Sequence, residues 1–214
     1  MPAIYLVRHG QASFGTDDYD VLSDLGVMQA AVAGRELARR APRDPLLVSG
    51  SLSRQQGTAA EIARELGISD IQTDDRWNEI DAHGIVDAEL GRAGASADLT
   101  SAAFQEVLDA ALVTMIDVGD QRWQEFSARV NDGLVAVTSS VPRGRDAIVV
   151  TSAAVIATVA SGLMTGSGQA VVSLNRVSVN AAISTLAASA RRTSLITFND
   201  HAHLIGEPGL VTYR

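Results

Sequence analysis

The sequence predicts an α/β protein, a three-layer αβα sandwich with a mainly parallel central sheet, an antiparallel edge strand and a helical lid insertion. Short apolar runs alternate with longer segments of helical periodicity, a pattern typical of a parallel sheet covered on both faces. The chain has 214 residues, of which 46% are hydrophobic and 20% charged. A chain of this size and composition buries a large core without a disulfide or a structural metal.

The first half of the chain alternates three strands with two helices. Ala3–Val7 is an apolar run that predicts a buried strand, followed by a polar loop at residues 11–20. Ser23 is a candidate N-cap for a helix through about Arg40, in which apolar residues recur at helical spacing. The remaining elements of this half are strands at Leu46–Ser49 and Ile68–Thr73 and a helix at Arg54–Leu66, ended by Gly67.

The second half begins with a change of pattern. From Asp74 to Thr100 the periodicity weakens and glycines recur, so we expect an excursion away from the sheet. Val177–Ala188 and Thr193–Phe198 alternate polar and apolar residues, which predicts a hairpin at the sheet edge. Between the excursion and the hairpin, the sequence predicts helices at Ser101–Ile116, Gln121–Ser139 and Ala153–Met164 and a strand at Ala147–Thr151.

These elements predict one domain over residues 1–214, with residues 74–140 forming a lid insertion that sets substrate choice. Its aromatic residues could line a pocket, although aromatics at helical spacing more often pack in a core; they are Trp77, Phe104, Trp123 and Phe126. Its many acids disfavour highly charged phosphates.

Composition excludes several classes of function. A net charge of −8 and a pI of about 4.9 disfavour nucleic acid as a partner. No stretch has the apolar length of a membrane span, and the N-terminus lacks the basic region of a signal peptide. The absence of cysteine excludes thiolate catalysis and Cys-ligated zinc. We therefore expect a cytoplasmic protein without a membrane partner; the oligomeric state stays open, and a homodimer is one alternative.

Three predicted strands end in residues that suit an anion: Arg8-His9-Gly10, Ser49-Gly50-Ser51 and Thr151-Ser152. Ligands of parallel sheets collect at this edge. A neutral His9 could attack phosphorus while Arg8 neutralises the phosphate, and the Gly10 carbonyl could orient the ring tautomer. An isolated triplet of this kind is more often structural, so the neighbouring residues decide its interpretation.

Two further residues could complete such a site. Arg54 lies in the first turn of a predicted helix, where an anion is also favoured by the helix dipole. Glu79 follows Trp77 after the third predicted strand, and an apolar surrounding would raise the pKa of its carboxyl. Taken alone, each would be read as a solvated surface residue.

Several ordered motifs resemble the histidine phosphatase superfamily, the group that includes the cofactor-dependent phosphoglycerate mutases and many phosphatases. They are Leu6-Val7-Arg8-His9-Gly10-Gln11-Ala12, Leu22 to Ala30, Ser51-Leu52-Ser53-Arg54 with Thr58-Ala59, the strand Ala147–Thr151 and the tail from Leu195 to Leu204. The resemblance covers roughly the first 80 residues in order, together with these later segments.

The resemblance implies phosphoryl transfer in two steps without a metal or organic cofactor, acting on a small phosphorylated substrate. His9 would become a phosphohistidine, and water would then release phosphate. Glu79 would protonate the leaving group and later deprotonate the water, with Asp81 as the alternative. The phosphate-binding residues would be Arg8, Arg54, Gln11 and Ser13.

The chain departs from the family at one position. Relatives usually carry a second histidine, followed by glycine, at the end of the strand that corresponds to Ala147–Thr151, and Ser152 stands there instead. A serine donates a neutral hydrogen bond in place of a charged one, a difference of roughly 1–2 kcal/mol. Ser152 could still bind phosphate together with the amides of Ala153 and Ala154, or it could simply cap the following helix.

The other histidines are weaker candidates. His83 could lie at the rim of the pocket and replace the missing histidine. His201 and His203 alternate near the C-terminus, and with Asp200 they could suggest a metal site, although solvated surface residues are the commoner explanation. We expect no metal.

Two functions from different classes follow from these residues. The leading hypothesis is phosphomonoester hydrolysis through His9. The alternative is a non-catalytic phosphate-binding or regulatory protein of the same fold, because Ser152 replaces a catalytic histidine; a phosphomutase, which must hold its phosphoryl group through the reaction, is disfavoured by the altered pocket.

Overall fold

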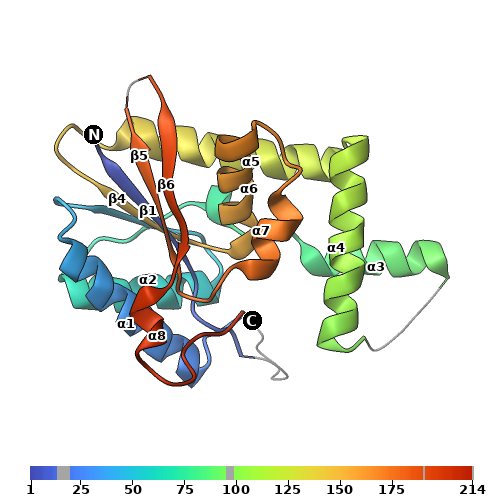
Figure 1. The fold of residues 1–214 in the computed structure, drawn as a ribbon, viewed down its shortest axis with the longest axis horizontal. Helices are drawn as coiled ribbons and strands as arrows, with labels where there is room; N and C mark the ends of the chain where they lie inside the picture. Colours follow the sequence, from blue (N-terminus) through green and yellow to red (C-terminus); the bar gives the residue numbers. More distant parts are fainter. Residues whose placement is uncertain (14–19, 95–98, 190, 214) are drawn as a thin grey trace.

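The computed structural model describes residues 1–214 except 14–19, 95–98, 190 and 214. Its centre is a six-stranded mixed sheet with the strand order β3-β2-β4-β1-β5-β6 (Figure 1). The strands are β1 (Ala3–Arg8), β2 (Leu46–Ser49), β3 (Gln72–Thr73), β4 (Ala147–Thr151), β5 (Ile183–Ala188) and β6 (Thr193–Asp200). The predicted α/β class with a mainly parallel sheet and an antiparallel edge is confirmed.

Strands β1 to β4 are parallel, and β5 and β6 form the expected antiparallel hairpin at one edge. Every residue of β4 is buried, as expected for a strand with helices on both faces. In β1 the side chains alternate between two cores: Ile4 and Leu6 face one, and Tyr5 and Val7 face the other. The pairing of Arg8 with Thr151 brings the carboxyl ends of β1 and β4 together.

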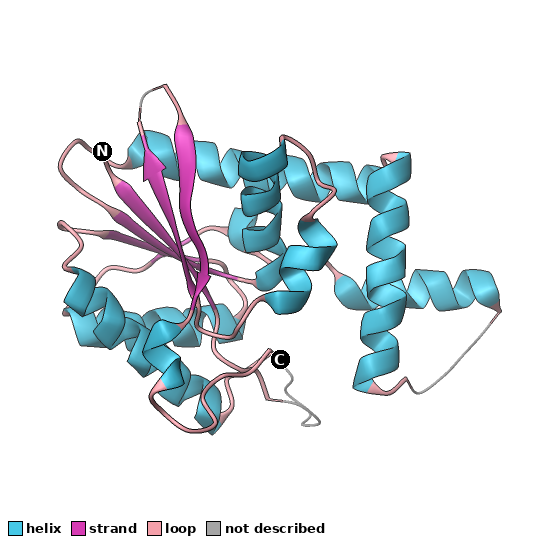
Figure 2. Cartoon of the chain, viewed as in Figure 1, coloured by secondary structure: helices cyan, strands magenta, loops and turns pink. Residues whose placement is uncertain are grey.

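The helices cover the two faces of the sheet (Figure 2). One face carries α1 and α2, whose apolar residues share a core with β1, β2 and β4. The other carries α5, α6 and α7, while α3 and α4 extend beyond the sheet (Figure 1). The helices are α1 (Asp24–Arg40), α2 (Ser53–Leu66), α3 (Ala82–Ala93), α4 (Ser101–Val118), α5 (Gln121–Ser140), α6 (Ala153–Thr165), α7 (Val171–Val177) and α8 (Ala202–Ile205), with a 3₁₀ turn at Asp75–Trp77.

Local signals account for most helix ends. The Ser23 hydroxyl accepts a hydrogen bond from the amide of Gly26 at 3.0 Å, which caps α1 as predicted. Gly67 ends α2 with a φ of 68°, a conformation that glycine adopts without strain.

Two expectations differ from the structure. The third strand is confined to Gln72–Thr73, because only two residues pair with β2 before the chain turns into the 3₁₀ helix. The strand expected to begin at Val177 begins at Ile183 instead. Residues 178–182 form a turn beside His9, in which the amide of Ala181, at a φ of 57°, donates to the carbonyl of His9.

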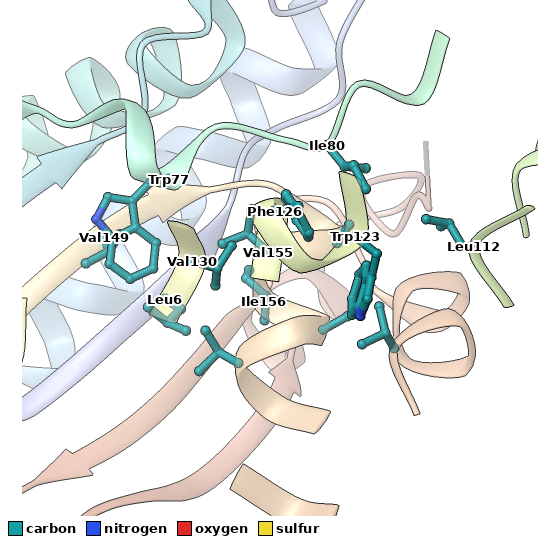
Figure 3. Packing of buried hydrophobic residues seen from close by; sticks show 14 of the residues in the cluster. Leu6, Trp77, Ile80, Leu112, Trp123, Phe126, Val130, Val149, Val155 and Ile156 are labelled. Atoms are coloured by element: carbon teal, nitrogen blue, oxygen red, sulfur yellow. The ribbon is translucent and has the colours of Figure 1, made fainter. Parts of the chain in front are cut away.

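The larger core lies between the sheet and α5 to α7 (Figure 3). Three of the four aromatic residues that could have lined a pocket are buried in it: Trp77, Trp123 and Phe126. Phe104 is only partly buried and lies 4.9 Å from the ring of His83, centroid to centroid. Helix α5 therefore belongs to the layer that covers the sheet, whereas α3 and α4 lie outside it.

In the described part of the chain, no helix has the length and apolar character needed to cross a membrane.

Candidate active site

His9 lies directly after β1, and its backbone amide and carbonyl are held by hydrogen bonds from three residues. Its amide donates to the carbonyl of Thr151 at 2.9 Å, and its carbonyl accepts from the amide of Ala181 at 3.2 Å and from Asn180 Nδ2 at 3.3 Å. The next amide, of Gly10, donates to Thr58 Oγ1 at 3.0 Å. The nucleophile predicted from the sequence therefore sits on a backbone tied to β4, α2 and the turn before β5.

Gly10 is required by a close backbone approach. A Cβ at this position would lie 2.3 Å from the carbonyl oxygen of Gly26, and a Cβ on Gly26 would lie 2.1 Å from the carbonyl oxygen of Gln11. The loop after β1 and the first turn of α1 thus pack backbone against backbone, which only glycines at both positions permit.

The tautomer of His9 follows from its two neighbours. Nδ1 lies 2.7 Å from the carbonyl oxygen of Gly10, which can only accept a hydrogen bond, so Nδ1 carries the proton. Nε2 accepts a hydrogen bond from Arg54 Nε at 3.1 Å. Burial, and then the positive charges of Arg54 and Arg8, hold the pKa of His9 well below its ordinary value of 6.5. His9 is therefore neutral, with an unprotonated Nε2 on the Arg54 side.

Arg54 lies in the first turn of α2, where the sequence predicted it, and its side chain touches His9. It also forms an ion pair with Asp20, whose second carboxylate oxygen accepts from the amide of Ser53 at 2.7 Å. Nothing in the sequence pointed to Asp20, because an acid in a polar loop carries no local signal that it will pair with an arginine on a distant helix. This ion pair fixes the direction of Arg54.

Arg8 lies at the end of β1 and is almost fully buried. Its guanidinium donates to the carbonyls of Ser178 and of Tyr213 near the C-terminus, the latter at 2.9 Å. Arg8 also acts electrostatically on both His9 and Glu79, since its charge lowers the pKa of each. The C-terminal segment therefore packs against the same arginine that the sequence assigned to phosphate.

Glu79 is half-buried, and its two carboxylate oxygens accept from the amides of Ile80 at 2.9 Å and Ala154 at 3.3 Å. Burial raises the pKa of Glu79 above its ordinary 4.5, against the opposing effects of these amides and of Arg54 and Arg8. A carboxyl whose pKa is raised keeps its proton to a higher pH than an ordinary glutamate does, which favours the role of a general acid.

Asp81, the alternative proton donor, serves another purpose in this structure. It is exposed, and its Oδ1 accepts from the amide of Gly84 at 2.9 Å, which caps α3. The carboxylate of Glu79, in contrast, accepts from the amide of Ala154 in the first turn of α6, and the charges of Arg54 and Arg8 act on it.

Ser152 follows β4 at the N-cap position of α6, but its side chain does not cap the helix. Its Oγ accepts a hydrogen bond from Gln55 Nε2 at 2.8 Å, and the residue is fully buried. Of the two amides expected to help it bind an anion, that of Ala154 donates to Glu79. Direct contact between Ser152 and phosphate stays a prediction.

Gln11 and Ser13 begin the loop after β1. Gln11 Oε1 accepts from Ser23 Oγ at 3.0 Å, and its backbone amide donates to Gln29 Oε1 at 2.8 Å. The amide of Ser13 donates to the carbonyl of Val21 at 2.8 Å. Both residues lie close to the site in the chain, and residues 14–19, which continue the loop, lie outside the described part.

The other histidines lie in different surroundings. His83 is exposed on α3 beside Phe104, and His203 Nε2 lies 3.1 Å from the carbonyl oxygen of Ala181. His201 Nδ1 lies 2.7 Å from the carbonyl oxygen of Asn199. Among the described residues, no group of three or more histidines and acids lies close enough to hold a metal ion.

Two open hollows lie away from His9. One of about 660 Å³ lies between β3 and α5, and one of about 420 Å³ lies along β6 and α6. Neither hollow is lined by Arg8, His9, Arg54 or Glu79.

Comparisons with known proteins find similar sequences and similar folds. A 2,3-bisphosphoglycerate-dependent phosphoglycerate mutase from Methylobacterium sp. (strain 4-46) is 37% identical over 87 residues, which cover 36% of this chain and 41% of the relative. Phosphoglycerate mutase from Bacillus anthracis str. Sterne has a similar fold, with a TM-score of 0.67, 17% identity and 94% of each chain covered. Mycobacterial glucosyl-3-phosphoglycerate phosphatase has a TM-score of 0.63 at 21% identity, with 94% of this chain and 100% of that chain covered.

The family assignment comes from the sequence itself. At these identities the structural similarities establish the fold. The stretch aligned with the Methylobacterium mutase covers less than half of either protein. The sequence pattern described as the histidine phosphatase superfamily (branch 1), in contrast, matches residues 4–201. This chain belongs to the histidine phosphatase superfamily (branch 1).

Proposed function

We propose that this protein hydrolyses small phosphomonoesters through a phosphohistidine on His9, without a metal or organic cofactor. The observation that carries the proposal is the state of His9. Its Nδ1 proton is donated to Gly10, its pKa is depressed, and its unprotonated Nε2 lies beside the guanidinium of Arg54. A neutral imidazole with a nearby cation is the state that attack on a phosphate requires.

In the first step the hydrogen bond from Arg54 Nε to His9 Nε2 breaks, Arg54 turns to the phosphoryl oxygens, and the freed lone pair of Nε2 attacks phosphorus. The bond between phosphorus and the leaving oxygen breaks, its electron pair goes to that oxygen, and the oxygen takes the proton of Glu79. Arg54 and Arg8, whose charges both act on His9, stabilise the negative charge of the phosphoryl oxygens. The raised pKa of Glu79 supports this role, because the carboxyl must be protonated when substrate binds.

In the second step Glu79, now ionised, removes a proton from water. The water oxygen attacks phosphorus, the bond between phosphorus and Nε2 breaks, and its electron pair returns to His9. The carboxyl and the imidazole are then in their starting states. Each turnover consumes one water and releases one alcohol and one phosphate.

Hydrolysis, in preference to mutase activity, is part of the proposal. Proteins of this fold include a phosphoserine phosphatase from Entamoeba histolytica as well as phosphoglycerate mutases. A mutase must hold its phosphoryl group between two transfers. Ser152, buried and bonded to Gln55, offers a weaker hold than a charged histidine, which favours loss of the group to water.

The alternative function is phosphate binding without turnover, and the same replacement at Ser152 favours it. The neutral nucleophile argues for the enzyme, because a binding protein gains nothing from an unprotonated imidazole beside an arginine. A covalent phosphohistidine separates the two functions.

The preference for a small monoester rests on the insertion at residues 74–140, which we propose contributes to substrate choice through α3 and α4. Three of its arginines are neutralised by ion pairs: Arg76 with Asp74, Arg92 with Glu89 and Arg122 with Asp120. Arg129 keeps its charge and donates to the carbonyls of Asp75 and Glu79. The insertion thus supplies little positive charge for a polyanion. A cytoplasmic location and the absence of a nucleic-acid partner complete the proposal.

The test is hydrolysis of an aryl phosphate in the presence of a chelator, comparing wild type with His9→Ala and with His83→Ala as a matched control. We expect His9→Ala to lower kcat/KM by at least about a thousandfold. His83→Ala, on the exposed face of α3, should leave it unchanged. A phosphoenzyme that is labile to acid and stable to base should be trapped in wild type and not in His9→Ala.

The pH dependence has a definite sign. The depressed pKa of His9 keeps activity high as the pH falls through 6.5, the ordinary histidine value, where an unperturbed imidazole would be protonated and inactive. For alkyl phosphates, whose leaving oxygen needs a proton, kcat/KM should fall as the pH rises and Glu79 loses its proton. Saturable binding of vanadate without turnover or a phosphoenzyme would instead support the binding protein.

A further inference from the structure

Gln55 is a fully buried glutamine in the first turn of α2, next to Arg54 in the chain. Its Nε2 donates to the carbonyl of Trp77 at 3.1 Å and to Ser152 Oγ at 2.8 Å, and its Oε1 accepts from the amide of Leu52 at 3.4 Å. One side chain thus links the start of α2, the 3₁₀ turn before Glu79 and the end of β4.

The orientation of this side-chain amide is fixed by backbone groups. The carbonyl of Trp77 can only accept a hydrogen bond, so the atom facing it must be the NH₂ group. The amide of Leu52 can only donate, so the oxygen must face that side. Ser152 therefore receives a hydrogen bond from Gln55, and its small buried side chain provides the acceptor that completes the link.

Gly50 packs against the same side-chain amide. A Cβ on Gly50 would lie 2.0 Å from Gln55 Oε1 and 2.7 Å from Asn78 Oδ1, so a side chain at this point would displace both amides from their present positions. The carbonyl of Trp77 also accepts a hydrogen bond from Thr151 Oγ1. Two buried side chains from different elements therefore hold one carbonyl group.

That carbonyl lies two residues before Glu79. Holding it to the end of β4 fixes where the Glu79 backbone emerges, and the amide of Ala154 then fixes the carboxylate at 3.3 Å. The same strand end accepts the amide of His9 through the carbonyl of Thr151. The backbone of His9 and the segment that carries Glu79 are thus both held by Thr151, at the end of β4.

We propose that Gln55 is a positioning residue for the proton-donating carboxyl of Glu79, so that neighbouring residues of one helical turn hold the two reacting groups. Arg54 contacts the nucleophile directly at 3.1 Å, and Gln55 sets the segment that carries the acid. This inference rests on the proposed hydrolase and adds to it a residue that sets the efficiency of leaving-group protonation.

The test uses phosphomonoesters whose leaving groups range from acidic phenols to simple alcohols. Gln55→Met keeps the length of the side chain and removes both donors, and Gln56→Met, at the exposed neighbouring position, is the matched control. A misplaced acid matters only where the leaving oxygen needs a proton. We expect Gln55→Met to lower kcat/KM about ten- to a hundredfold for alkyl phosphates and less than about threefold for acidic phenols.

Two further measurements separate positioning from a general loss of structure. Combined with Glu79→Gln, Gln55→Met should cause no additional loss on alkyl phosphates, because the group it positions is already gone. Thr151→Val removes the second hydrogen bond to the carbonyl of Trp77 with little change of shape. Its loss of kcat/KM should again be confined to alkyl phosphates, and it should be smaller than that of Gln55→Met. Thr151→Val serves as the test if Gln55→Met does not fold.

The outcomes are distinct for the two proposals. A loss that is equal for all leaving groups, no loss at all, or a loss that multiplies with that of Glu79→Gln overturns the role of Gln55 while His9-dependent hydrolysis stands. Absence of hydrolysis and of a phosphoenzyme in wild type overturns the hydrolase, and the positioning role with it.

Discussion

Replacing Glu79 by glutamine should stabilise the protein at neutral pH. Burial outweighs the hydrogen bonds from Ile80 and Ala154 and the charges of Arg54 and Arg8, so the pKa of Glu79 is raised above 4.5. The unfolded chain therefore loses this proton at a lower pH than the folded chain does. Between the two pKa values the folded chain binds more protons, and the free energy of unfolding falls by up to about 1.4 kcal/mol per pH unit as the pH rises. Glutamine, which cannot ionise, avoids this loss.

The assay is urea unfolding at a series of pH values. The difference in unfolding free energy, Glu79→Gln minus wild type, should be constant in acid and rise with pH from near 4.5, the ordinary glutamate pKa. It should level off above the pKa of the folded state, and the height of the plateau measures the shift. Glu106→Gln, at an exposed carboxyl, controls for the change of net charge. A difference that falls as the pH rises would show that the folded protein favours the ionised carboxylate, and the argument from burial would be refuted.

The same variant should lose activity where it gains stability. For alkyl phosphates kcat/KM should fall by about 10²- to 10⁴-fold, the usual contribution of a general acid, and for acidic phenols much less. The pairing of a stability gain with an activity loss is expected where a carboxyl is kept in an unfavourable surrounding for its chemistry.

Two further predictions separate local from tertiary effects. Asp81→Ala removes the cap that bonds the amide of Gly84 at 2.9 Å, so it should cost about 1 kcal/mol in thermal unfolding, with kcat within about twofold of wild type; a large loss of kcat would make Asp81 the proton donor. Gly26→Ala forces a Cβ to within 2.1 Å of the carbonyl oxygen of Gln11 and should destabilise by about 1–3 kcal/mol. Gly91→Ala, in α3 with nothing within 4 Å of the new Cβ, should stabilise by up to about 1 kcal/mol; equal effects in urea unfolding would contradict the packing argument.

Elements with local signals were predicted closely. Ser23 caps α1 and Gly67 ends α2 because both act on amides or dihedrals within a few residues. The apolar runs of β1 and β4 predicted buried parallel strands, since a strand covered on both faces needs little else. These runs also placed His9 at the carboxyl edge of the sheet.

Elements that depend on distant partners were not predictable in this way. The length of β3 depends on how far the chain stays beside β2, and residues 178–182 turn because they bond to His9 and to the C-terminal segment. Asp20 and Gln55 carried no signal in the sequence for the same reason. Each acts through a partner more than thirty residues away: Asp20 through Arg54, and Gln55 through Ser152.

The sequence by itself determined the α/β class, the position of His9 at a strand end and the identity of the charged residues that accompany it. Periodicity, capping residues and motif order are written in neighbouring positions, so they can be read without coordinates. Only the tertiary structure decided the state of those residues. The depressed pKa of His9, the raised pKa of Glu79 and the burial of Ser152 under Gln55 all depend on atoms that long stretches of chain separate. Hydrogen bonding and desolvation depend on distance and surroundings, and these exist only once the chain has folded.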